Sequence, residues 1–516
     1  MKISARELLG ELLDPGSFVS WDRPPVAVDA SPEYRKELSA AAATAGIDEA
    51  VLTGEGLLRG RRVAVIACEF AFLAGSIGVA AAERIVTAVE RATELGLPLL
   101  ASPTSGGTRM QEGTVAFVQM VKVAGALAVH KAAGHPYLVY LRDPTMGGVF
   151  ASWGSLGHMT FAEPGALVGF LGPRVYQALY GKQFPEGVQT AENLYHNGVI
   201  DGVVPVSVFR RIAHRTLVVL CDGPIPLPGK GGDAPAPAAG VGEFLAGPQE
   251  RGGLAVLDTA EVHAWQSVLI SRRGDRPGIR ELLRHVTDRV PLSGTGQGEL
   301  DRTVVHALAR FRGQPCIVFG HDRAGQSPDN TMGPAALREA RRSMHLAAEL
   351  RVPLVLVIDT AGASLSREAE ERGLAPEIAR CLADLVTLDT PTVSVLLGQG
   401  SGGGALALLP ADRVLAAANG WLAPLPPEGA SAIIHRDTWH APGLAAAQRI
   451  RAVDLEADGI VDRIVHEYPD AAEEPVDFAM RMVETIAEEL AALTARPLEA
   501  LRSARHLRYR RLGLGA

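Results

Sequence analysis

The sequence has few cysteines, few aromatic residues and no long apolar segment. None of the four cysteines among its 516 residues forms a CxxC pair, so neither a zinc ribbon nor a disulfide framework is indicated. We interpret them as small buried apolar groups in a reducing compartment: Cys68, Cys221, Cys316 and Cys381. Aromatic residues make up 5% of the chain, which favours close packing of helices over a binding surface rich in rings.

Membrane spans, signal peptides and basic stripes are also lacking. No uninterrupted apolar run reaches the roughly 18 residues of a membrane span, and charges interrupt the N-terminal segment too early for a signal peptide. Lys and Arg total 50 against 58 for Asp and Glu, a net charge of -8. These features predict a cytoplasmic protein that binds neither a membrane nor nucleic acid.

Motifs for nucleotide hydrolysis and nucleophilic catalysis are missing or weak. The P-loop pattern G-x-x-x-x-G-K-[ST] does not occur, so ATP hydrolysis is not expected. Residues 398–403 satisfy G-x-G-x-x-G, but no acidic strand end follows about 20 residues later, so a dinucleotide site is not indicated. No convincing Ser-His-Asp or Cys-His arrangement is present either.

A segment rich in proline, glycine and alanine divides the chain. It lies at residues 226–258 and cannot build a packed element, so we predict a linker there. The predicted domains are residues 1–225 and 259–516. In both, short apolar runs alternate with longer segments of helical period, which is typical of α/β domains.

The two predicted domains repeat one pattern. Prolines before apolar runs, and a pair of adjacent glycines, recur 255 residues apart. The matching positions are Pro98 and Pro353, Pro136 and Pro391, and Gly147–Gly148 and Gly402–Gly403. Further along, residues 197–201 match residues 458–462 at an offset of 261. This register predicts two copies of one fold.

Each half carries two glycine-bearing turns between a predicted strand and a predicted helix. They contain Gly106, Gly107, Gly147 and Gly148 in the first half, and Gly362, Gly402, Gly403 and Gly404 in the second. Without a side chain over the backbone, adjacent N–H groups can point at one ligand oxygen, and the helix N-terminus adds partial positive charge. Such turns are typical of anion or oxyanion sites, and where the ligand is a thioester carbonyl two amide donors stabilise the enolate that forms when an α-proton leaves.

Several motifs resemble those of a known family. The first half is similar to the β subunit of bacterial acetyl-CoA carboxylase carboxyltransferase at residues 72–78, 105–113, 147–152 and 161–167. The second half is similar to the α subunit of the same enzyme at residues 370–373, 398–406, 412–415 and 427–433. The resemblance covers about residues 50–205 and 310–465, so the chain looks like both subunits fused.

The resemblance implies an α/β fold of two tandem crotonase-like (ClpP/crotonase) β-β-α superhelical domains. The first domain would bind acyl-CoA and the second would receive carboxybiotin. The implied catalytic residues form two oxyanion holes, one from Gly147 and Gly148 and the other from Gly403 and Gly404. The implied substrate-binding residues are Gly106, Gly107, Arg109, Gly362 and Gly402, and no metal is implied.

The implied reaction transfers CO2 from carboxybiotin to the α-carbon of acetyl-CoA and gives malonyl-CoA for fatty acid biosynthesis. The freed ureido nitrogen would take the α-proton while backbone amides hold the developing oxyanions. The chain has no Met-Lys-Met carrier motif and no ATP-binding region, so biotin carboxyl carrier protein and biotin carboxylase are expected as separate chains. In the family the site lies between domains of two protomers, which implies a homodimer or a higher homo-oligomer.

The sequence also departs from the family. The four-cysteine zinc ribbon of bacterial β subunits is missing, and residues 359–365 read Asp-Thr-Ala-Gly-Ala-Ser-Leu where Asp-Thr-Pro-Gly-Ala-Tyr-Pro is usual. Gln399 and Ser401 stand where Glu and Gly are usual. We favour drift within an active fused enzyme over a changed donor or acceptor. The competing hypotheses are a biotin-independent decarboxylase or hydratase, for which Glu112 alone is a poor acid/base pair, and a non-catalytic scaffold.

The remaining polar candidates receive mostly structural interpretations. The histidines near the second glycine turn are interpreted as packed or solvated groups: His130, His135 and His158. Arg109 and Lys122 are candidates either for contacts with CoA phosphates or for solvated surface charge. Glu428 is interpreted as a helix cap, and the basic tail from Arg496 as a solvated helix end rather than a docking site.

Overall fold

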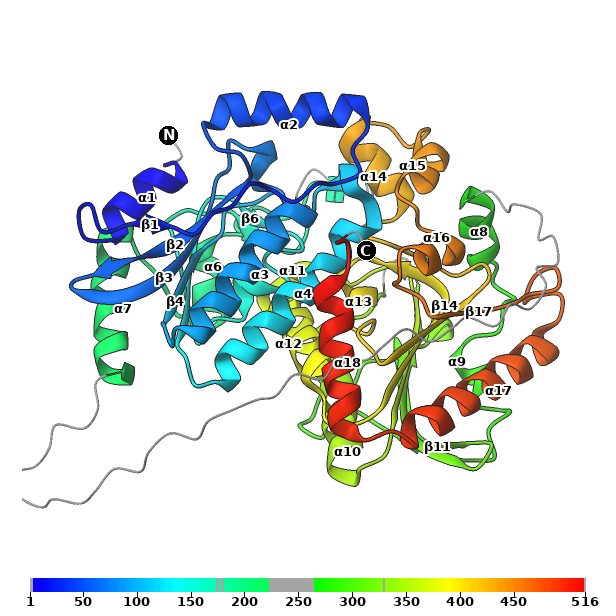
Figure 1. Cartoon of the computed structure of the whole chain (residues 1–516). Coiled ribbons are helices and arrows are strands. Elements are labelled where there is room, and N and C mark those ends of the chain that lie inside the picture. The colour runs from blue at the N-terminus through cyan, green and yellow to red at the C-terminus, as the bar shows by residue number, and fades with distance from the viewer. Residues whose placement is uncertain (1–2, 173–175, 178–180, 222–263, 328–329, 515–516) are drawn as a thin grey trace, which may run out of the picture.

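The computed structural model describes residues 3–172, 176–177, 181–221, 264–327 and 330–514. Two halves lie side by side, each with a central sheet and covering helices (Figure 1). The predicted linker at residues 226–258 and the predicted boundaries at its two ends lie outside the described residues.

The first half is built on a seven-stranded sheet in the order β1-β2-β3-β4-β5-β7-β9. Its strands are β1 (Val19–Ser20), β2 (Val51–Leu58), β3 (Arg61–Cys68), β4 (Leu99–Ser102), β5 (Tyr137–Leu141), β7 (Met159–Ala162) and β9 (Gly202–Val203). A separate two-stranded ribbon pairs β6 (Thr145–Met146) with β8 (Val168–Gly169). Its α-helices include α1 (Ala5–Leu12), α2 (Pro32–Ala45), α3 (Val79–Glu94), α4 (Gly113–Ala132), α6 (Ala191–His196) and α7 (Val206–Cys221).

The second half has an eight-stranded sheet in the order β10-β11-β12-β13-β14-β15-β17, with β16 paired to β14. Its strands are β10 (Asp288–Leu292), β11 (Val304–Phe311), β12 (Gln314–His321), β13 (Leu354–Thr360), β14 (Thr392–Ser401), β15 (Arg413–Ala417), β16 (Trp421–Ala423) and β17 (Arg463–Val465). Its α-helices include α8 (Ala264–Ser271), α9 (Ile279–Leu282), α10 (Pro334–Leu350), α11 (Arg367–Glu371), α12 (Leu374–Thr387), α13 (Gly402–Leu406), α14 (Pro427–Ile434), α15 (Ala441–Ala447), α16 (Ala452–Ala457), α17 (Pro475–Thr494) and α18 (Leu498–Arg511).

Both halves contain the same tight hairpin followed by parallel strands. The β2–β3 hairpin turns at Arg59 and Gly60, with φ of 49° and 79°, and the β11–β12 hairpin turns at Arg312 and Gly313, with φ of 45° and 90°. Two consecutive positive φ angles are what a type I′ turn requires. Further along, β5 and β14 begin 255 residues apart and α6 and α16 begin 261 apart, as the repeat predicts. The predicted crotonase-like fold in two copies is confirmed.

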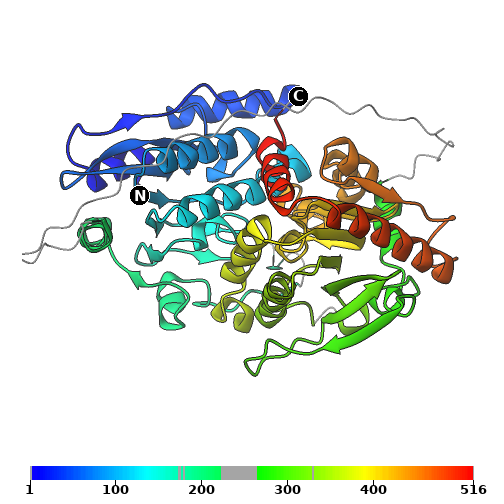
Figure 2. The same cartoon turned by 60° about the horizontal axis from the view of Figure 1, so that its bottom comes forward.

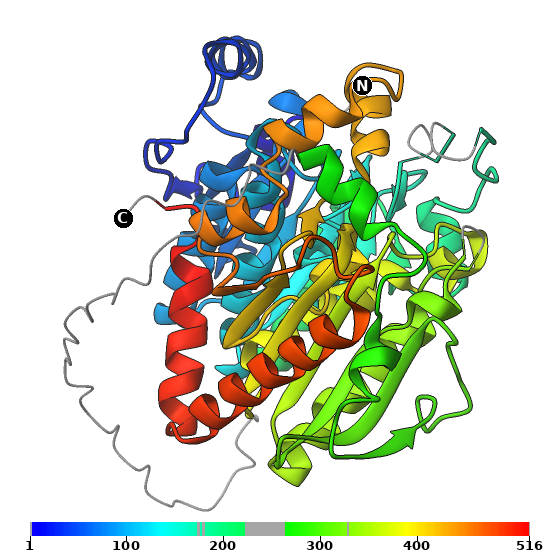
Figure 3. The same cartoon turned by 90° about the vertical axis from the view of Figure 1, so that its right-hand side faces the viewer.

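Each sheet is covered on both faces because the side chains of its strands alternate. In β3, Ala64 and Ile66 belong to the core beneath α3 and α4, whereas Val63 and Val65 belong to the core beneath α1 and α7. In the second half, α17 covers one face of the sheet (Figure 3) and α10 and α12 cover the other. The core of α3 and α4 continues into that of α10 and α12, so the halves share apolar packing.

Helix α4 lies at the junction of the halves. The apolar helix Met110–Ala132 has the length and composition to cross a membrane, yet 83% of its apolar window is buried inside the protein. A Cβ on Gly125 would lie 3.0 Å from Cγ1 of Val386 in α12, so the two helices approach closely there. The apolar character of this helix is therefore explained by its place in the core.

The basic C-terminal tail is not a solvated helix end. Helix α18 lies against both halves (Figure 2), and Arg505 is 1% exposed. Its guanidinium pairs with Asp412 at 2.6 Å and donates to three backbone carbonyls. Arg510 of the same helix pairs with Glu83 and Glu90 of α3 in the first half. The sequence-based interpretation was wrong because the acidic partners are distant in sequence.

Three of the four cysteines are buried, as expected, and Cys221 at the end of α7 is exposed. All four are free.

A buried carboxyl in α10 gives a prediction for stability. Glu339 lies 3.4 Å from Nε2 of His306, and burial raises the pKa of Glu339 to about 7, although a hydrogen bond from the N–H of Asp301 opposes the rise. A carboxyl whose pKa is raised on folding contributes stability at low pH and loses it as the pH rises from 4.5 to about 7. The pKa of His306 is lowered to about 4, so His306 stays neutral over most of that window.

We therefore expect Glu339→Gln to gain unfolding free energy relative to the natural chain as the pH rises from 4.5 to about 7, by about 2–3 kcal/mol in total. Urea unfolding of both proteins across this range measures the difference. A difference that stays constant with pH would contradict the prediction.

Candidate active site

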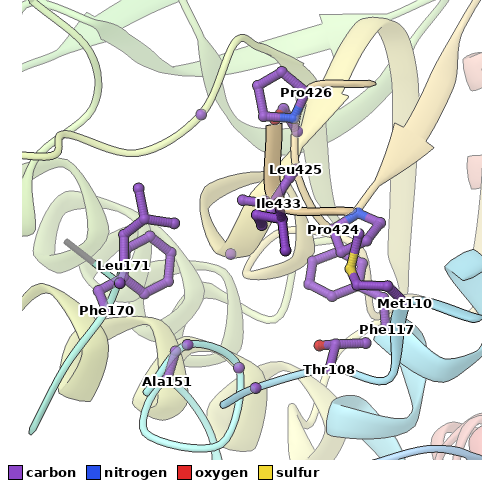
Figure 4. A pocket seen from close by; sticks show the side chains of 18 of the residues that line it. Thr108, Met110, Phe117, Ala151, Phe170, Leu171, Pro424, Leu425, Pro426 and Ile433 are labelled. Carbon is purple, nitrogen blue, oxygen red and sulfur yellow. The ribbon is translucent and has the colours of Figure 1, made fainter. Parts of the chain in front are cut away.

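One cavity of about 1920 Å³ brings the glycine turns of both halves together. Its lining includes Gly106, Gly107, Gly147 and Gly148 from the first half and Gly362, Gly402 and Gly403 from the second. Much of the remaining wall is apolar, including Phe117 and Phe170 from the first half and Leu425 and Ile433 from the second (Figure 4). A single chain thus joins the two turns, whereas the resemblance implied a site between protomers.

In the Gly147–Gly148 turn of the first half, one of the two N–H groups predicted to bind an oxyanion is free. Gly147 has φ of 65° and its N–H donates to the carbonyl of Gly169 at 3.1 Å, which extends the β6–β8 ribbon. No described residue accepts a hydrogen bond from the N–H of Gly148. A Cβ on Gly107 would lie 3.9 Å from that nitrogen, so a glycine there keeps the approach to it open.

The turn at Gly402–Gly404 in the second half has the same backbone conformation as the Gly147–Gly148 turn. Gly402 has φ of 64°, like Gly147, and α13 begins at this residue, so Gly403 and Gly404 lie in the first helical turn, whose N–H groups lack intrahelical acceptors. A Cβ on Gly403 would lie 2.9 Å from the ring of Phe170. Gly404 does not line the cavity, and a Cβ on it would lie 2.6 Å from the sulfur of Met332.

In each half, a side-chain hydroxyl accepts a hydrogen bond from the glycine of the other turn. The N–H of Gly107 donates to Oγ of Ser105 at 2.9 Å, and the N–H of Gly362 donates to Oγ1 of Thr360 at 3.1 Å. These pairs are again 255 residues apart. These hydrogen bonds fix the two loops, so neither of the two N–H groups is free to bind a ligand.

The cations of the cavity come from the second half and were missed in the sequence. Arg272 pairs with Glu428 at 2.5 Å and donates to Oε1 of Gln399 at 3.2 Å. Arg323 pairs with Asp359 at 3.0 Å. A third arginine, Arg436, and the acids Glu37 and Asp359 also line the wall, so the described lining carries three arginines and two carboxylates. Because Arg272 and Arg323 are already paired with Glu428 and Asp359, this count does not favour a ligand of either charge.

Glu428 is an ion-pair partner and not a helix cap. Helix α14 has Pro426 at its N-cap position and no side-chain cap there. Burial raises the pKa of Glu428, but the hydrogen bonds and charge of Arg272 outweigh it, so the pKa is lowered. No local motif marks Arg272, which lies 156 residues from its partner.

Comparisons with known proteins decide the family. A family model described as "Carboxyl transferase domain" matches residues 11–505. The chain is 62% identical over 514 residues to the "Probable biotin-dependent acyl-coenzyme A carboxylase beta3 subunit" of Mycobacterium tuberculosis (strain ATCC 25618 / H37Rv), covering 99% of each chain. The chain belongs to the carboxyl transferase family of biotin-dependent acyl-CoA carboxylases. The resemblance read from the motifs is thereby confirmed.

Two further matches are more distant. The carboxyltransferase is 36% identical over 532 residues to "Acetyl-coenzyme A carboxylase carboxyl transferase subunits beta/alpha" of Salinispora arenicola (strain CNS-205), covering 99% of this chain and 91% of the other. Among solved structures, a hexameric transcarboxylase 12S matches with 20% identity and a TM-score of 0.37, covering 96% of this chain and 91% of the other.

Arg109 lies outside the cavity of this carboxyltransferase. It is 1% exposed and pairs with Glu49 through both guanidinium nitrogens, at 2.5 and 3.0 Å. Lys122 is also buried and pairs with Glu83 at 2.5 Å. Neither is a solvated surface charge, and both are committed to carboxylates of the first half, so neither proposed role for these cations holds.

The described lining contains no histidine, cysteine or lysine. Glu112, the weak acid/base candidate, lies outside the lining and accepts hydrogen bonds from the N–H of Val79 at 2.6 Å and the hydroxyl of Tyr34 at 2.5 Å. Among the described residues, no group of three or more His, Cys, Asp or Glu side chains could hold a metal ion. The described lining therefore offers no histidine-activated nucleophile, and the N–H of Gly148 is a backbone donor available to a reacting oxygen.

Glu370 of the second half holds a wall of the cavity in the first. It is 4% exposed, and its Oε1 accepts from the N–H of Phe170 at 2.9 Å and from Nε2 of Gln189 at 2.6 Å. Burial raises the pKa of Glu370, and these hydrogen bonds oppose the rise. The ring of Phe170 lies against Gly403. The carboxyl of Glu370 therefore links the position of the Gly402–Gly403 turn to the first half.

We expect Glu370→Ala to lower the free energy of unfolding by about 2–4 kcal/mol, because it leaves two buried donors without an acceptor. Glu370→Gln keeps an acceptor oxygen and serves as the matched control with a smaller loss. Urea unfolding measures both. Equal losses in the two variants would argue against the hydrogen bonds as the cause.

Proposed function

We propose that this chain transfers CO2 from carboxybiotin, borne by a separate carrier protein, to the α-carbon of acetyl-CoA to give malonyl-CoA. The observation that supports it is the single cavity lined by a glycine turn from each half. The free N–H group of Gly148 on one side, and that of Gly403 on the other, act as the two oxyanion holes, for the thioester enolate and for the ureido oxygen. Gly106, Gly107, Gly362 and Gly402 line the approach to them.

Carboxybiotin supplies the CO2 and, after release, a base for the α-proton, so the protein needs no side-chain nucleophile. What the chain supplies is orientation and backbone donors inside a largely apolar wall, where hydrogen bonds are stronger than in water. A hydratase is not supported, because Glu112 is committed to structural hydrogen bonds.

We further propose, from the family resemblance of the sequence, that biotin carboxylase and biotin carboxyl carrier protein are partner chains, and that the protein is a cytoplasmic homo-oligomer with a role in lipid synthesis. Incubation with carboxylated carrier protein and acetyl-CoA, propionyl-CoA or butyryl-CoA, followed by mass spectrometry of the CoA products, tests the proposal. Acetyl-CoA should be carboxylated fastest. No transfer to any acyl-CoA would overturn the carboxyltransferase proposal, and faster transfer to a longer chain would overturn the choice of acetyl-CoA.

A further inference from the structure

The hydroxyl of Ser401 is buried in the wall of the cavity without a partner. The residue is 1% exposed, and no described residue shares a hydrogen bond with its Oγ. Ser401 is the last residue of β14 and the N-cap residue of α13, yet its side chain makes no cap hydrogen bond. A buried hydroxyl without a partner is costly, which calls for a reason for its presence.

The neighbours of this hydroxyl belong to the turns of the second half. A Cβ on Gly362 would lie 3.8 Å from Oγ of Ser401, so the lack of a side chain at Gly362 leaves space on that side of the hydroxyl. The next residues along the chain, Gly402 and Gly403, line the same cavity. The hydroxyl therefore lies within one turn of the backbone donors of α13.

The duplicated fold provides an internal comparison. Position 401 of the second half corresponds to Met146 of the first, 255 residues earlier, and both line the cavity. A thioether suits an apolar acyl chain, whereas a hydroxyl suits a polar ring that carries both hydrogen-bond donors and an acceptor. The two turns thus differ in polarity at the residue just before the glycines.

We propose that Ser401 is a substrate-contacting residue that hydrogen-bonds the ureido ring of biotin at the second glycine turn. The inference rests on the proposed function, since it assigns biotin to the second half. The ring fills the space beside Gly362 and gives the hydroxyl the partner that the protein does not supply. Ser401 then helps to distinguish biotin from acyl-CoA, together with the backbone donors.

The test uses the reverse reaction, in which malonyl-CoA carboxylates free biotin. For Ser401→Ala we expect KM for biotin to rise roughly fivefold, the effect of one lost hydrogen bond, with KM for malonyl-CoA within twofold of the natural chain. The melting temperature should not fall, because the hydroxyl has no protein partner to lose. Ser394→Ala is the matched control on the same strand.

Ser394 donates to the carbonyl of Leu408 at 2.6 Å and does not line the cavity, so its loss should lower the melting temperature and leave both KM values unchanged. An unchanged KM for biotin in active Ser401→Ala would overturn the inference, and so would a rise in KM for malonyl-CoA alone. Absence of any transfer by the natural chain would instead count against the proposed function, which keeps the two failures apart.

Discussion

Replacing Gly403 by alanine is expected to reduce carboxyl transfer roughly 100-fold, the usual cost of losing an oxyanion donor. The new methyl group would lie 2.9 Å from the ring of Phe170, closer than real Cβ atoms approach, and at a tight 3.0 Å from Cδ1 of Ile378. Either the ring or the first turn of α13 must move. A displaced N–H group no longer points at the developing oxyanion, so the rate constant at saturating substrate should fall.

The same substitution elsewhere separates this effect from a general change in a helix. Gly10 lies within α1 and an added Cβ there would meet no atom within 4 Å. Gly10→Ala should leave the rate unchanged and raise stability by up to about 1 kcal/mol, because alanine favours the helix. Steady-state kinetics and thermal unfolding of both variants measure the contrast. Full activity in a folded Gly403→Ala protein would remove this turn from the chemistry.

The fold could be predicted from the sequence because its signals are local and repeated. Prolines such as Pro98 and Pro353 stand directly before buried strands in both halves, β4 and β13. The glycine pairs follow at the same offset, and Gly147 and Gly402 share a positive φ that side chains disfavour. Where a backbone conformation demands one residue type, the sequence records the structure directly.

The site was only partly predictable, since hydrogen bonds between distant segments decide it. A pair of glycines does not reveal that the N–H of Gly147 is consumed by Gly169, because the β6–β8 ribbon forms only in the folded chain. The buried place of Arg109 likewise depends on Glu49, 60 residues earlier. Burial of the Arg109 guanidinium depends on a carboxylate that neutralises it, and no local sequence pattern indicates which carboxylate will lie beside it.

Replacing Arg505 by methionine is expected to lower the free energy of unfolding by about 3–5 kcal/mol, the cost of leaving one partner of a buried ion pair alone. The side chain of Asp412 is 3% exposed, and its carboxylate would remain buried without its cation. The carbonyls of Leu385, Leu388 and Thr390 would also lose a donor, at the end of α12 and the approach to β14. Arg502 provides the matched control on the same helix.

Arg502 and its partner Asp389 are both more than half exposed, so Arg502→Met should cost at most about 1 kcal/mol. Adding Asp412→Asn to Arg505→Met should restore part of the loss, because it removes the uncompensated charge while Asn keeps an acceptor for the N–H of Thr392. Urea unfolding of the four proteins measures these contributions. Equal losses for Arg505 and Arg502 would mean that α18 is held by its apolar contacts, and the buried ion pair would then not be what fastens this helix to the second half.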